Sequence, residues 1–298
     1  MSLSIFTNAA SMASTNAMNK SNSLLSTAME RLGTGKRINS AADDAAGLQI
    51  ATRLQGQTNG MTVAQRNISD ATALLQTSEG AFDEVSNIMY RMKDLASQAA
   101  NDTNTDKDRQ AIDSELNELN SELGNIMKNT SYAGDKLFGD SGKFKDALNF
   151  QIGSSTDETM EVNLSKELNG GSGSLINTNG GFNKLTASSN SFINASSGSI
   201  NLTNASDAKA LMTALEGSLD EVGSVRSKLG ASINRLGHTA SNLANMKDNT
   251  DLALSNIQDA DYATEASTMS RNQLLAQTSM SMLKQSNSMS SMVMSLLG

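Results

Sequence analysis

Proline, cysteine and tryptophan are absent from this 298-residue sequence, and aromatic residues make up only 3% of it. Proline removes a backbone donor and clashes with the preceding helical turn, so a chain without it permits helices of any length. The missing cysteines exclude disulfides and thiolate metal sites. Aromatic side chains supply the largest buried areas, so a compact globule of this length would lack its usual filling. The composition therefore favours thin, elongated helical packing.

Positive charge is also scarce, because 23 Lys and Arg stand against 31 Asp and Glu and give a net charge of −8. Nucleic acids and anionic membranes are bound by clustered Lys and Arg, and the sequence has no such cluster. The first charge is Lys20, and no apolar run near the amino end is long enough for a secretory signal or a membrane span. We therefore expect no nucleic-acid partner, no membrane insertion and, if the chain is exported, another route.

Enzyme chemistry has little to build on. His238 is the only histidine, so a Ser-His-Asp catalytic triad would have to use it as the base. A zinc site needs several His or Cys ligands, which one chain cannot supply. Asp102, Asn104 and Asp106 alternate like ligands of a calcium loop, but Lys107 stands where such a loop needs glycine. We interpret that run as helix termination and capping. We predict that the chain is not an enzyme and binds neither cofactor nor metal.

Three internal stretches place apolar residues at alternating steps of three and four, the spacing of coiled-coil helices. The first two, at 74–99 and 112–126, are separated by the capping-rich run NDTNTD and predict a helical hairpin. The third predicts a helix from near Ala205 to Thr250, which needs a long partner. The residues predicted to form this core are Leu74, Val85, Ile88, Met92, Ile112, Leu116, Leu119, Leu123, Leu215, Val222, Leu229, Leu236 and Leu243.

Both ends of the chain carry apolar stripes of their own. These are Leu25, Met29 and Leu32 near the amino end and Leu275, Met282, Met289 and Leu296 near the carboxyl end. The amino-terminal stripe stops at the pair Gly33 and Gly35. A carboxyl-terminal helix so rich in Ser and Met cannot stand alone in water, because isolated helices are marginal without a packed face. We expect it to be disordered alone and ordered by a partner, and the two chain ends to be complementary.

Residues 139–205 have a different character. Short alternating or β-branched runs at 149–152 and 160–164 predict strands, and the run NGGSGSLINTNGG predicts an exposed loop. Glycosylation of the Ser/Thr/Asn-rich stretch is an alternative to a plain flexible loop. The fold class predicted is mainly α: a long antiparallel coiled-coil helical rod with a small β-hairpin region, plus terminal helices that pair as a coiled coil.

Three segments of the sequence resemble bacterial flagellins. Residues 19–54, NKSNSLLSTAMERLGTGKRINSAADDAAGLQIATRL, resemble the motif in which a terminal helix, a turn and a DDAAG segment lead into the rod domain. Residues 66–85 look like the start of the first long rod helix, and residues 259–287 look like the carboxyl-terminal signature. The middle departs from many relatives, because roughly 65 residues cannot hold large outer domains. The resemblance is therefore to a minimal flagellin.

The resemblance implies a structural subunit of the bacterial flagellar filament, which self-assembles into a helical tube for motility and is secreted, extracellular and exported unfolded through the flagellar type III apparatus. It assigns the apolar stripes at both chain ends to packing of the inner tube. The implied domains are an N-terminal inner-tube helix at 1–44, the N-terminal rod helices at 45–138, a β-hairpin with a variable surface loop at 139–205, the C-terminal rod helix at 206–250 and a C-terminal inner-tube helix at 251–298.

The resemblance also implies partners: other copies of the chain, a flagellar export chaperone at the C-terminal helix, filament cap and hook-junction proteins, and Toll-like receptor 5. The positions that match the receptor contacts of the family are Arg91, Leu95 and Glu115. Their residue types are equally explained by two solvated charges and one packing residue. Two alternative functions stay open, a hook-filament junction protein and a secreted adhesin or immune ligand that acts as a monomer.

Overall fold

The computed structural model describes residues 9–139, 141–169, 182, 185, 190–193 and 199–297, excepting the side chains of 169 and 290–297. Contacts between residues divide the chain into two compact units. We call the first, Met1–Thr58 with Lys247–Gly298, the terminal unit. The second, Asn59–Met246, is the rod unit. The boundaries between these units differ from the domain boundaries expected from the sequence. The expected boundaries stay a prediction.

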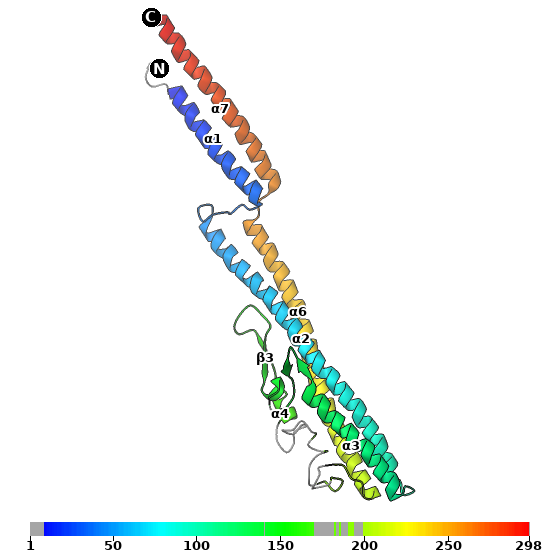
Figure 1. Cartoon of the computed structure of the whole chain (residues 1–298). Helices are drawn as coiled ribbons and strands as arrows, with labels where there is room; N and C mark the ends of the chain where they lie inside the picture. The colour runs from blue at the N-terminus through cyan, green and yellow to red at the C-terminus, as the bar shows by residue number, and fades with distance from the viewer. Residues whose placement is uncertain are drawn as a thin grey trace. The chain divides into compact units, whose positions relative to one another are not determined.

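The terminal unit contains two antiparallel helices, α1 (Ala9–Thr34) and α7 (Tyr262–Leu297), which lie side by side (Figure 1). The first ends at the glycine pair. Gly35 has a left-handed φ of 72°, and its N–H donates to the carbonyl of Arg31 at 2.9 Å. Glycine adopts this φ without strain and so closes the last helical turn. The predicted pairing of the terminal helices is confirmed.

Two long helices, α2 (Ala45–Ala99) and α6 (Ala205–Gln258), contribute residues to both units. The expected end of the second, near residue 250, is too early. Residues 251–258 contain neither Gly nor Pro, so nothing breaks the helix before Gln258. There the chain is tied to the segment after α1, because the N–H of Arg37 donates to the carbonyl of Gln258 at 2.7 Å.

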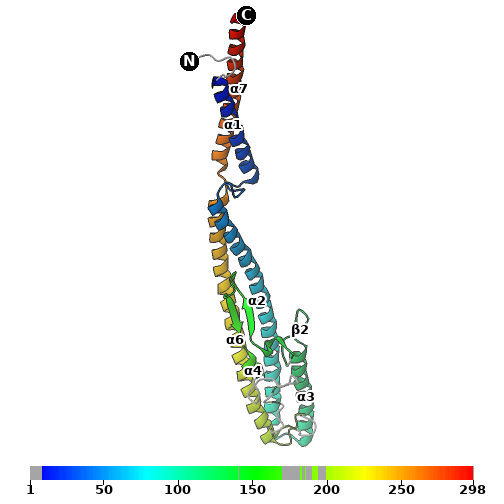
Figure 2. The same cartoon turned by 90° about the vertical axis from the view of Figure 1, so that its left-hand side faces the viewer.

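In the rod unit, α2 and α6 pack with α3 (Asp106–Asn129), and Figures 1 and 2 show the three helices side by side. Buried positions on α2 follow steps of three and four along the whole unit. They are Met61, Ala64, Ile68, Ala71, Leu75, Ser78, Phe82, Val85, Met89, Met92, Ala96 and Ala99. The corresponding positions on α6 are Ala208, Leu211, Leu215, Ser218, Val222, Val225, Leu229, Leu236 and Leu243. The mainly α coiled-coil fold predicted from the sequence is confirmed.

One row of this core differs from the row read in the sequence. The sequence pattern on α2 includes Leu74 and Ile88, but the fully buried row is the neighbouring one, which contains Leu75, Phe82 and Met89. Leu74 is also buried and Ile88 is half-buried, because neighbours on both sides of α2 cover a face wider than a two-helix seam. Of the other predicted core residues, Leu119 is half-buried and the rest are buried.

The turn between α2 and α3 is made by the capping-rich run. Thr105 is the N-cap of α3, and its side chain accepts from the N–H of Asp108 while the Asp108 carboxylate accepts from the N–H of Thr105 at 2.9 Å. This reciprocal capping box satisfies two backbone donors that the first helical turn leaves free. The buried Arg109 binds the end of α2, because its Nε donates to the carbonyl of Ala99, the last residue of that helix, at 3.2 Å.

Two small antiparallel hairpins accompany the helices. The first, β1 (Ser131–Tyr132) with β2 (Asp135–Lys136), turns through Ala133 and Gly134, which have φ values of 52° and 91°. Two positive φ values define the hairpin turn whose twist matches its strands. The sequence interpretation missed this hairpin. The second is the predicted one, β3 (Leu148–Gln151) with β4 (Thr159–Val162).

Packing holds these hairpins, since isolated two-stranded ribbons are marginal. A 3-10 turn, η1 (Lys143–Lys145), buries Phe144, whose ring stacks on Phe138 with centroids 5.8 Å apart. A short helix, α4 (Ser165–Asn169), follows β4. Most of the predicted exposed loop lies outside the described residues.

Candidate functional site

The seam between α1 and α7 is lined by small and polar side chains. On α1 the buried residues are Ser14, Ser21 and Ala28, seven positions apart, and on α7 the buried residue is Asn272, at 5% exposure. Seven-residue spacing keeps these positions on one face of each helix. Half-buried residues extend the seam on both helices: Ser11, Met18, Leu25 and Leu32 on α1, and Met269, Ala276, Ser279, Leu283 and Ser286 on α7.

Polar contacts near both ends of the pair define its antiparallel register. Ser11 Oγ donates to Asn287 Oδ1 at 3.3 Å, and Arg31 Nη1 donates to Glu265 Oε1 at 3.0 Å. Interpolation between these two contacts puts large side chains of one helix near small side chains of the other. By this register we expect Ser14 near Leu283, Met18 near Ser279, and Ala28 near Met269. The fully buried positions of this seam thus hold no large apolar side chain.

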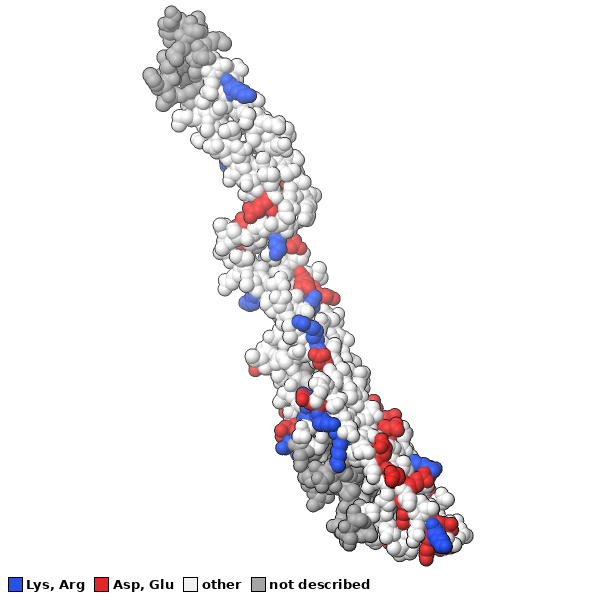
Figure 3. All heavy atoms as spheres, in the orientation of Figure 1, with Lys and Arg blue, Asp and Glu red and all other residues white. Residues whose placement is uncertain are grey.

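Many large apolar side chains of the helix pair are exposed instead. On α1 and α7 they are Met12, Leu24, Met29, Leu274, Leu275, Met280, Met282 and Met289, which are 45–64% exposed. The two helices carry six charged residues between them, and Figure 3 shows mostly uncharged atoms on this face of the pair. Apolar side chains exposed in such numbers, on helices with few charges, favour association with another surface.

The residues predicted for assembly divide between the seam and this outward surface. Leu25 and Leu32 are half-buried at the seam. Met29 is exposed. The sequence pattern placed Met29 in the seam, but Ala28 occupies that position. Leu275, Met282 and Met289 are exposed, and the side chain of Leu296 lies outside the described residues. Their role in assembly stays a prediction.

Sequence reasoning missed the small residues of the seam. A search for apolar residues passes over Ser14, Ser21 and Asn272, although the regular spacing of the first two with Ala28 is visible in the sequence. Leu274 and Met280 were missed among the outward residues, since they lie off the seven-residue row. A search for small residues at heptad spacing finds the seam.

The DDAAG segment, residues 43–47, shapes the entry to α2. Asp43 accepts hydrogen bonds from the backbone and side chain of Ser40, and these bonds lower the pKa of its carboxyl. The N–H of Gly47 donates to Asp44 Oδ1 at 2.8 Å. A Cβ on Gly47 would lie 2.5 Å from Asp44 Oδ2 and 2.7 Å from the Cδ1 of Ile38, so a larger residue would require these side chains to shift. Asp43, Asp44 and Gly47 of this segment thus each have a local structural role.

The residues that match receptor contacts lie in the rod unit. Arg91 on α2 and Glu115 on α3 form an ion pair at 2.7 Å, and both side chains are about half exposed. Leu95 is only 3% exposed and belongs to the core. The structure therefore brings two of the three residues together at the surface and places the third beneath it.

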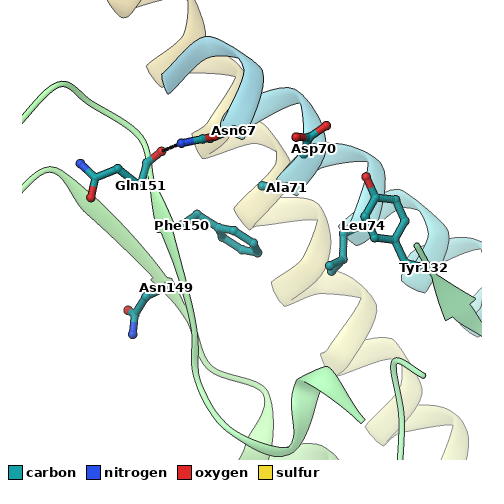
Figure 4. Close-up of a pocket in the computed structure, with 8 residues that line it drawn as sticks. All are labelled: Asn67, Asp70, Ala71, Leu74, Tyr132, Asn149, Phe150 and Gln151. Carbon is teal, nitrogen blue, oxygen red and sulfur yellow. Dashed lines mark hydrogen bonds between the residues drawn. The ribbon is translucent and has the colours of Figure 1, made fainter. Parts of the chain in front are cut away.

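A hollow of about 270 Å³ opens between α2 and the two hairpins of the rod unit (Figure 4). The rings of Phe150 and Tyr132 and the side chain of Leu74 face it, while Asn149 points away. Asn67 ties its edge, because Nδ2 donates to the carbonyl of Gln151 at 3.3 Å. The residues that line the hollow include no nucleophile paired with a base, so it offers no catalytic constellation.

Other predicted signals lie apart from these surfaces. His238 is exposed on α6. Within the described residues, no group of three or more His, Cys, Asp or Glu side chains is placed to hold a metal ion. None of the helices in the described part of the chain is both long and apolar enough to cross a bilayer.

A helical unit with its own core and a helix pair with many exposed apolar side chains are typical of a structural subunit that associates with other chains. The chain belongs to the bacterial flagellin family. The N-terminal helical region of bacterial flagellin matches residues 5–143, and the C-terminal helical region matches residues 212–297. This is a family of structural proteins and not of enzymes. The protein is thus a structural subunit of the extracellular flagellar filament, which confers motility.

Flagellins of two other bacteria match this chain over all or nearly all of its length. The chain is 32% identical to Flagellin A of Vibrio anguillarum, with all of both chains aligned over 381 positions. It is 36% identical over 270 residues to a flagellin of Halalkalibacterium halodurans, covering 91% of this chain and 90% of that one. The longer Vibrio alignment contains positions that this 298-residue chain lacks, in agreement with a minimal flagellin.

Two solved structures are similar to the chain. A crystal structure of Bacillus cereus flagellin has 27% sequence identity and a TM-score of 0.45, covering 60% of this chain and 88% of that chain. A putative flagellar hook-associated protein from Vibrio parahaemolyticus has a TM-score of 0.57 and 19% identity, covering 73% of this chain and 100% of that chain. The second likeness shows a shared fold alone.

Proposed function

We propose that this flagellin polymerises by burying the outward apolar side chains of its terminal unit against the terminal helices of neighbouring copies. The observation that carries the proposal is the distribution of side chains: the fully buried positions of the seam hold serine, alanine and asparagine, whereas eight leucines and methionines are exposed. Full burial of one Leu or Met side chain contributes about 1.5–3 kcal/mol. Eight such side chains give association a large apolar driving force that the isolated chain does not use.

In assembly of this kind, the terminal helices become ordered as the chain is incorporated into the filament. The fully buried positions of the seam hold no large apolar side chain, so the terminal helices gain most of their stability when a neighbour covers them. The entropy lost on ordering them is offset only where several copies meet, which is at the end of an existing filament. Growth is therefore restricted to filament ends, and free chains stay dispersed.

The two rival functions fit the residues less well. A monomeric adhesin or immune ligand would leave the whole outward surface of α1 and α7 in water, which soluble monomers rarely do. A hook-filament junction protein shares the fold, but the full-length likeness is to filament flagellins. Abundance in filaments sheared from cells separates the alternatives, because a junction protein is present in few copies.

Deletion of residues 281–298 tests the proposal. We expect a soluble chain whose rod unit gives a helical circular dichroism spectrum and unfolds cooperatively, but which sediments as a monomer and does not grow from filament seeds in electron micrographs. A matched control changes two exposed polar residues of α7, Gln277 and Gln285, to Ser and keeps normal growth. Normal filament growth from the truncated chain would contradict the proposal.

An export chaperone is expected to bind the same helix before assembly. Met280, Met282 and Met289 are exposed on α7, and methionine adapts to differently shaped partner surfaces. Chaperone binding to the full chain, measured by calorimetry, should be lost after deletion of residues 281–298 and unchanged in the Gln277→Ser/Gln285→Ser control. Equal binding by the truncated chain would place the chaperone elsewhere.

Recognition by Toll-like receptor 5 is a second proposed role. It is supported by the exposed pair of Arg91 and Glu115, whose charged groups are available to a partner. Leu95 supports α2 from the core and is not expected to contact the receptor directly. Arg91→Ala should weaken receptor signalling with the helical spectrum unchanged, while Arg66→Ala, an exposed change on the same helix, should leave signalling intact. Equal potency of both variants would sink this role.

A further inference from the structure

Methionine is distributed in opposite ways in the two units. In the rod unit, five methionines are at most 2% exposed: Met61, Met89, Met92, Met127 and Met160. In the terminal unit, five methionines are 49–60% exposed: Met12, Met29, Met280, Met282 and Met289. Met246, at 39% exposure, lies on α6 at the limit of the rod unit. The thioether groups that an external reagent can reach therefore concentrate on the outward surface of α1 and α7.

Exposed thioethers are oxidised by peroxides. Hydrogen peroxide transfers one oxygen atom to the sulfur, so an S–O bond forms, the O–O bond breaks and the peroxide leaves as water. The product, methionine sulfoxide, is a polar side chain, and reductases return it to methionine. Buried methionines react more slowly because the oxidant has to reach the sulfur. Exposure thus predicts selective oxidation of the terminal unit.

We propose that the five outward methionines of the terminal unit form an oxidation site through which peroxides reversibly stop polymerisation of the free chain. This inference rests on the assembly function proposed above. A sulfoxide in water costs the free chain nothing, because its oxygen stays solvated. The same oxygen, pressed into an apolar contact between copies without a hydrogen-bond partner, opposes association.

The expected effect is large because several sites act together. One unsatisfied polar group in a buried contact lowers affinity by about tenfold or more. The critical concentration for filament growth should therefore rise by at least about tenfold when the five sites are oxidised. The rod unit keeps its helical spectrum and unfolding midpoint, since its core methionines are protected. Selective loss of assembly without loss of folding is the signature of this site.

The test treats the free full-length chain with hydrogen peroxide and maps sulfoxides by peptide mass spectrometry. Met246 serves as an internal reference for the oxidant dose. The five outward methionines should reach half-oxidation at least about ten times sooner than the five buried ones. Seeded growth is then measured before and after treatment, and again after incubation with methionine sulfoxide reductases, which should restore it.

Two variants identify the sites responsible. Four further methionines are changed to Leu in both variants, so that their oxidation does not affect the result. They are Met18 and Met269, which are half-buried at the seam, and Met292 and Met294, whose side chains lie outside the described residues. The first variant also changes the five outward methionines to Leu, a substitution that conserves volume, and should polymerise equally before and after treatment. The second instead changes Met89 and Met92 of the rod core to Leu and should stay sensitive.

Several outcomes overturn the inference. One is undiminished growth of the native chain with all five outward methionines oxidised, which leaves the assembly function standing. Another is slow oxidation of these sites relative to the buried ones. If the Leu variant fails to grow even untreated, recovery of native growth by the reductases decides: full recovery supports the site, and no recovery contradicts it. Failure of the untreated native chain to grow from seeds contradicts the assembly function instead.

Discussion

The rod unit and the terminal unit bury different kinds of side chain, although both are built from long antiparallel helices. In the rod unit the core contains Phe82, Leu116 and Leu215, all with no measurable exposure. In the terminal unit the buried positions of the helix pair are Ser14, Ser21, Ala28 and Asn272, while eight leucines and methionines of this pair are exposed and the others described are only half-buried. The same heptad geometry therefore buries a large apolar core in the rod unit and leaves large apolar side chains exposed in the terminal unit.

The difference teaches where each unit obtains its stability. Apolar burial contributes about 25 cal/mol for each Å² removed from water, so the rod unit is stabilised within one chain. The terminal pair has the shape of a coiled coil but less of its driving force, because its fully buried positions carry small or polar side chains. Its stabilising contacts are proposed to come from other copies. Changes to the two units should therefore have opposite consequences for folding and for assembly.

The sharpest test of the comparison removes a large side chain from each unit. Phe82→Ala should lower the free energy of unfolding by about 3–5 kcal/mol, because its ring is fully buried and packs edge-on against Phe138 at 5.0 Å. Leu275→Ala, on the outward surface, should change it by less than about 0.5 kcal/mol. Urea unfolding followed by circular dichroism measures both. Similar losses would erase the distinction between the units.

A second test concerns a buried carboxylate of the rod unit. Asp113 on α3 accepts the N–H of Leu202 at 3.0 and 3.1 Å and fastens the segment before α6. Asp113→Ala leaves that donor unsatisfied and should cost about 1–3 kcal/mol of unfolding free energy, whereas Asp113→Asn keeps an acceptor and should cost less than about 1 kcal/mol. Denaturant titration at neutral pH measures the difference. Equal losses would mean that the hydrogen bond contributes little.

The same residue gives a pH dependence of known sign. Burial raises the pKa of Asp113 above its ordinary 3.8, the Leu202 N–H lowers it, and the nearby Asp207 raises it. The folded chain therefore holds this proton more tightly than the unfolded chain. The stability that this tighter proton binding contributes is fully present below pH 3.8 and is lost as the pH rises through the raised pKa. Asp113→Asn should remove this loss, so the variant gains relative to the native chain as the pH rises.

A third test adds apolar surface to the weak seam of the terminal unit. Asn272→Leu places an apolar side chain at the buried polar position of α7 and should stabilise the α1–α7 pair by about 1 kcal/mol. Slower amide hydrogen exchange along α7 measures this. Gln273→Leu, at the exposed neighbouring position, is the matched control and should leave exchange unchanged. Faster exchange in Asn272→Leu would show that the polar seam is already the stable arrangement.

The smallest expected effect comes from a surface ion pair that joins two helices of the rod unit. Arg226 on α6 bonds both Glu79 and Asp83 on α2, at 3.0 and 2.9 Å. All three side chains are about a third or more exposed, so Arg226→Ala should cost at most about 1 kcal/mol of unfolding free energy. The cost should shrink further at high salt. A larger, salt-independent loss would mean that Arg226 acts through packing.

Regular features of this molecule could be predicted from its sequence because they depend on local periodicity. The heptads of α6, the capping run before α3 and the hairpin of β3 and β4 all appear where the pattern places them. Arg226 lies beside the buried positions Val222 and Val225 of α6. Periodicity alone could not choose between adjacent rows, since the choice depends on how many neighbours cover the helix.

The candidate site was harder to predict because its pattern is inverted. A search for apolar stripes finds Leu275, Met282 and Met289 but assigns them no inner or outer side. Only the pairing of α1 with α7 shows that Asn272 occupies the seam and that the stripe faces away. The turn of Ala133 and Gly134 was missed for a related reason, because a strand of two residues has no period to detect.

Amide hydrogen exchange of the free chain and of the assembled filament tests the central claim most directly. The account predicts that residues 9–34 and 262–289 exchange fast in the free chain and slowly in the filament. The core segments of α2, α3 and α6 should be protected in both. Equal and strong protection of the two terminal helices before and after assembly would contradict it.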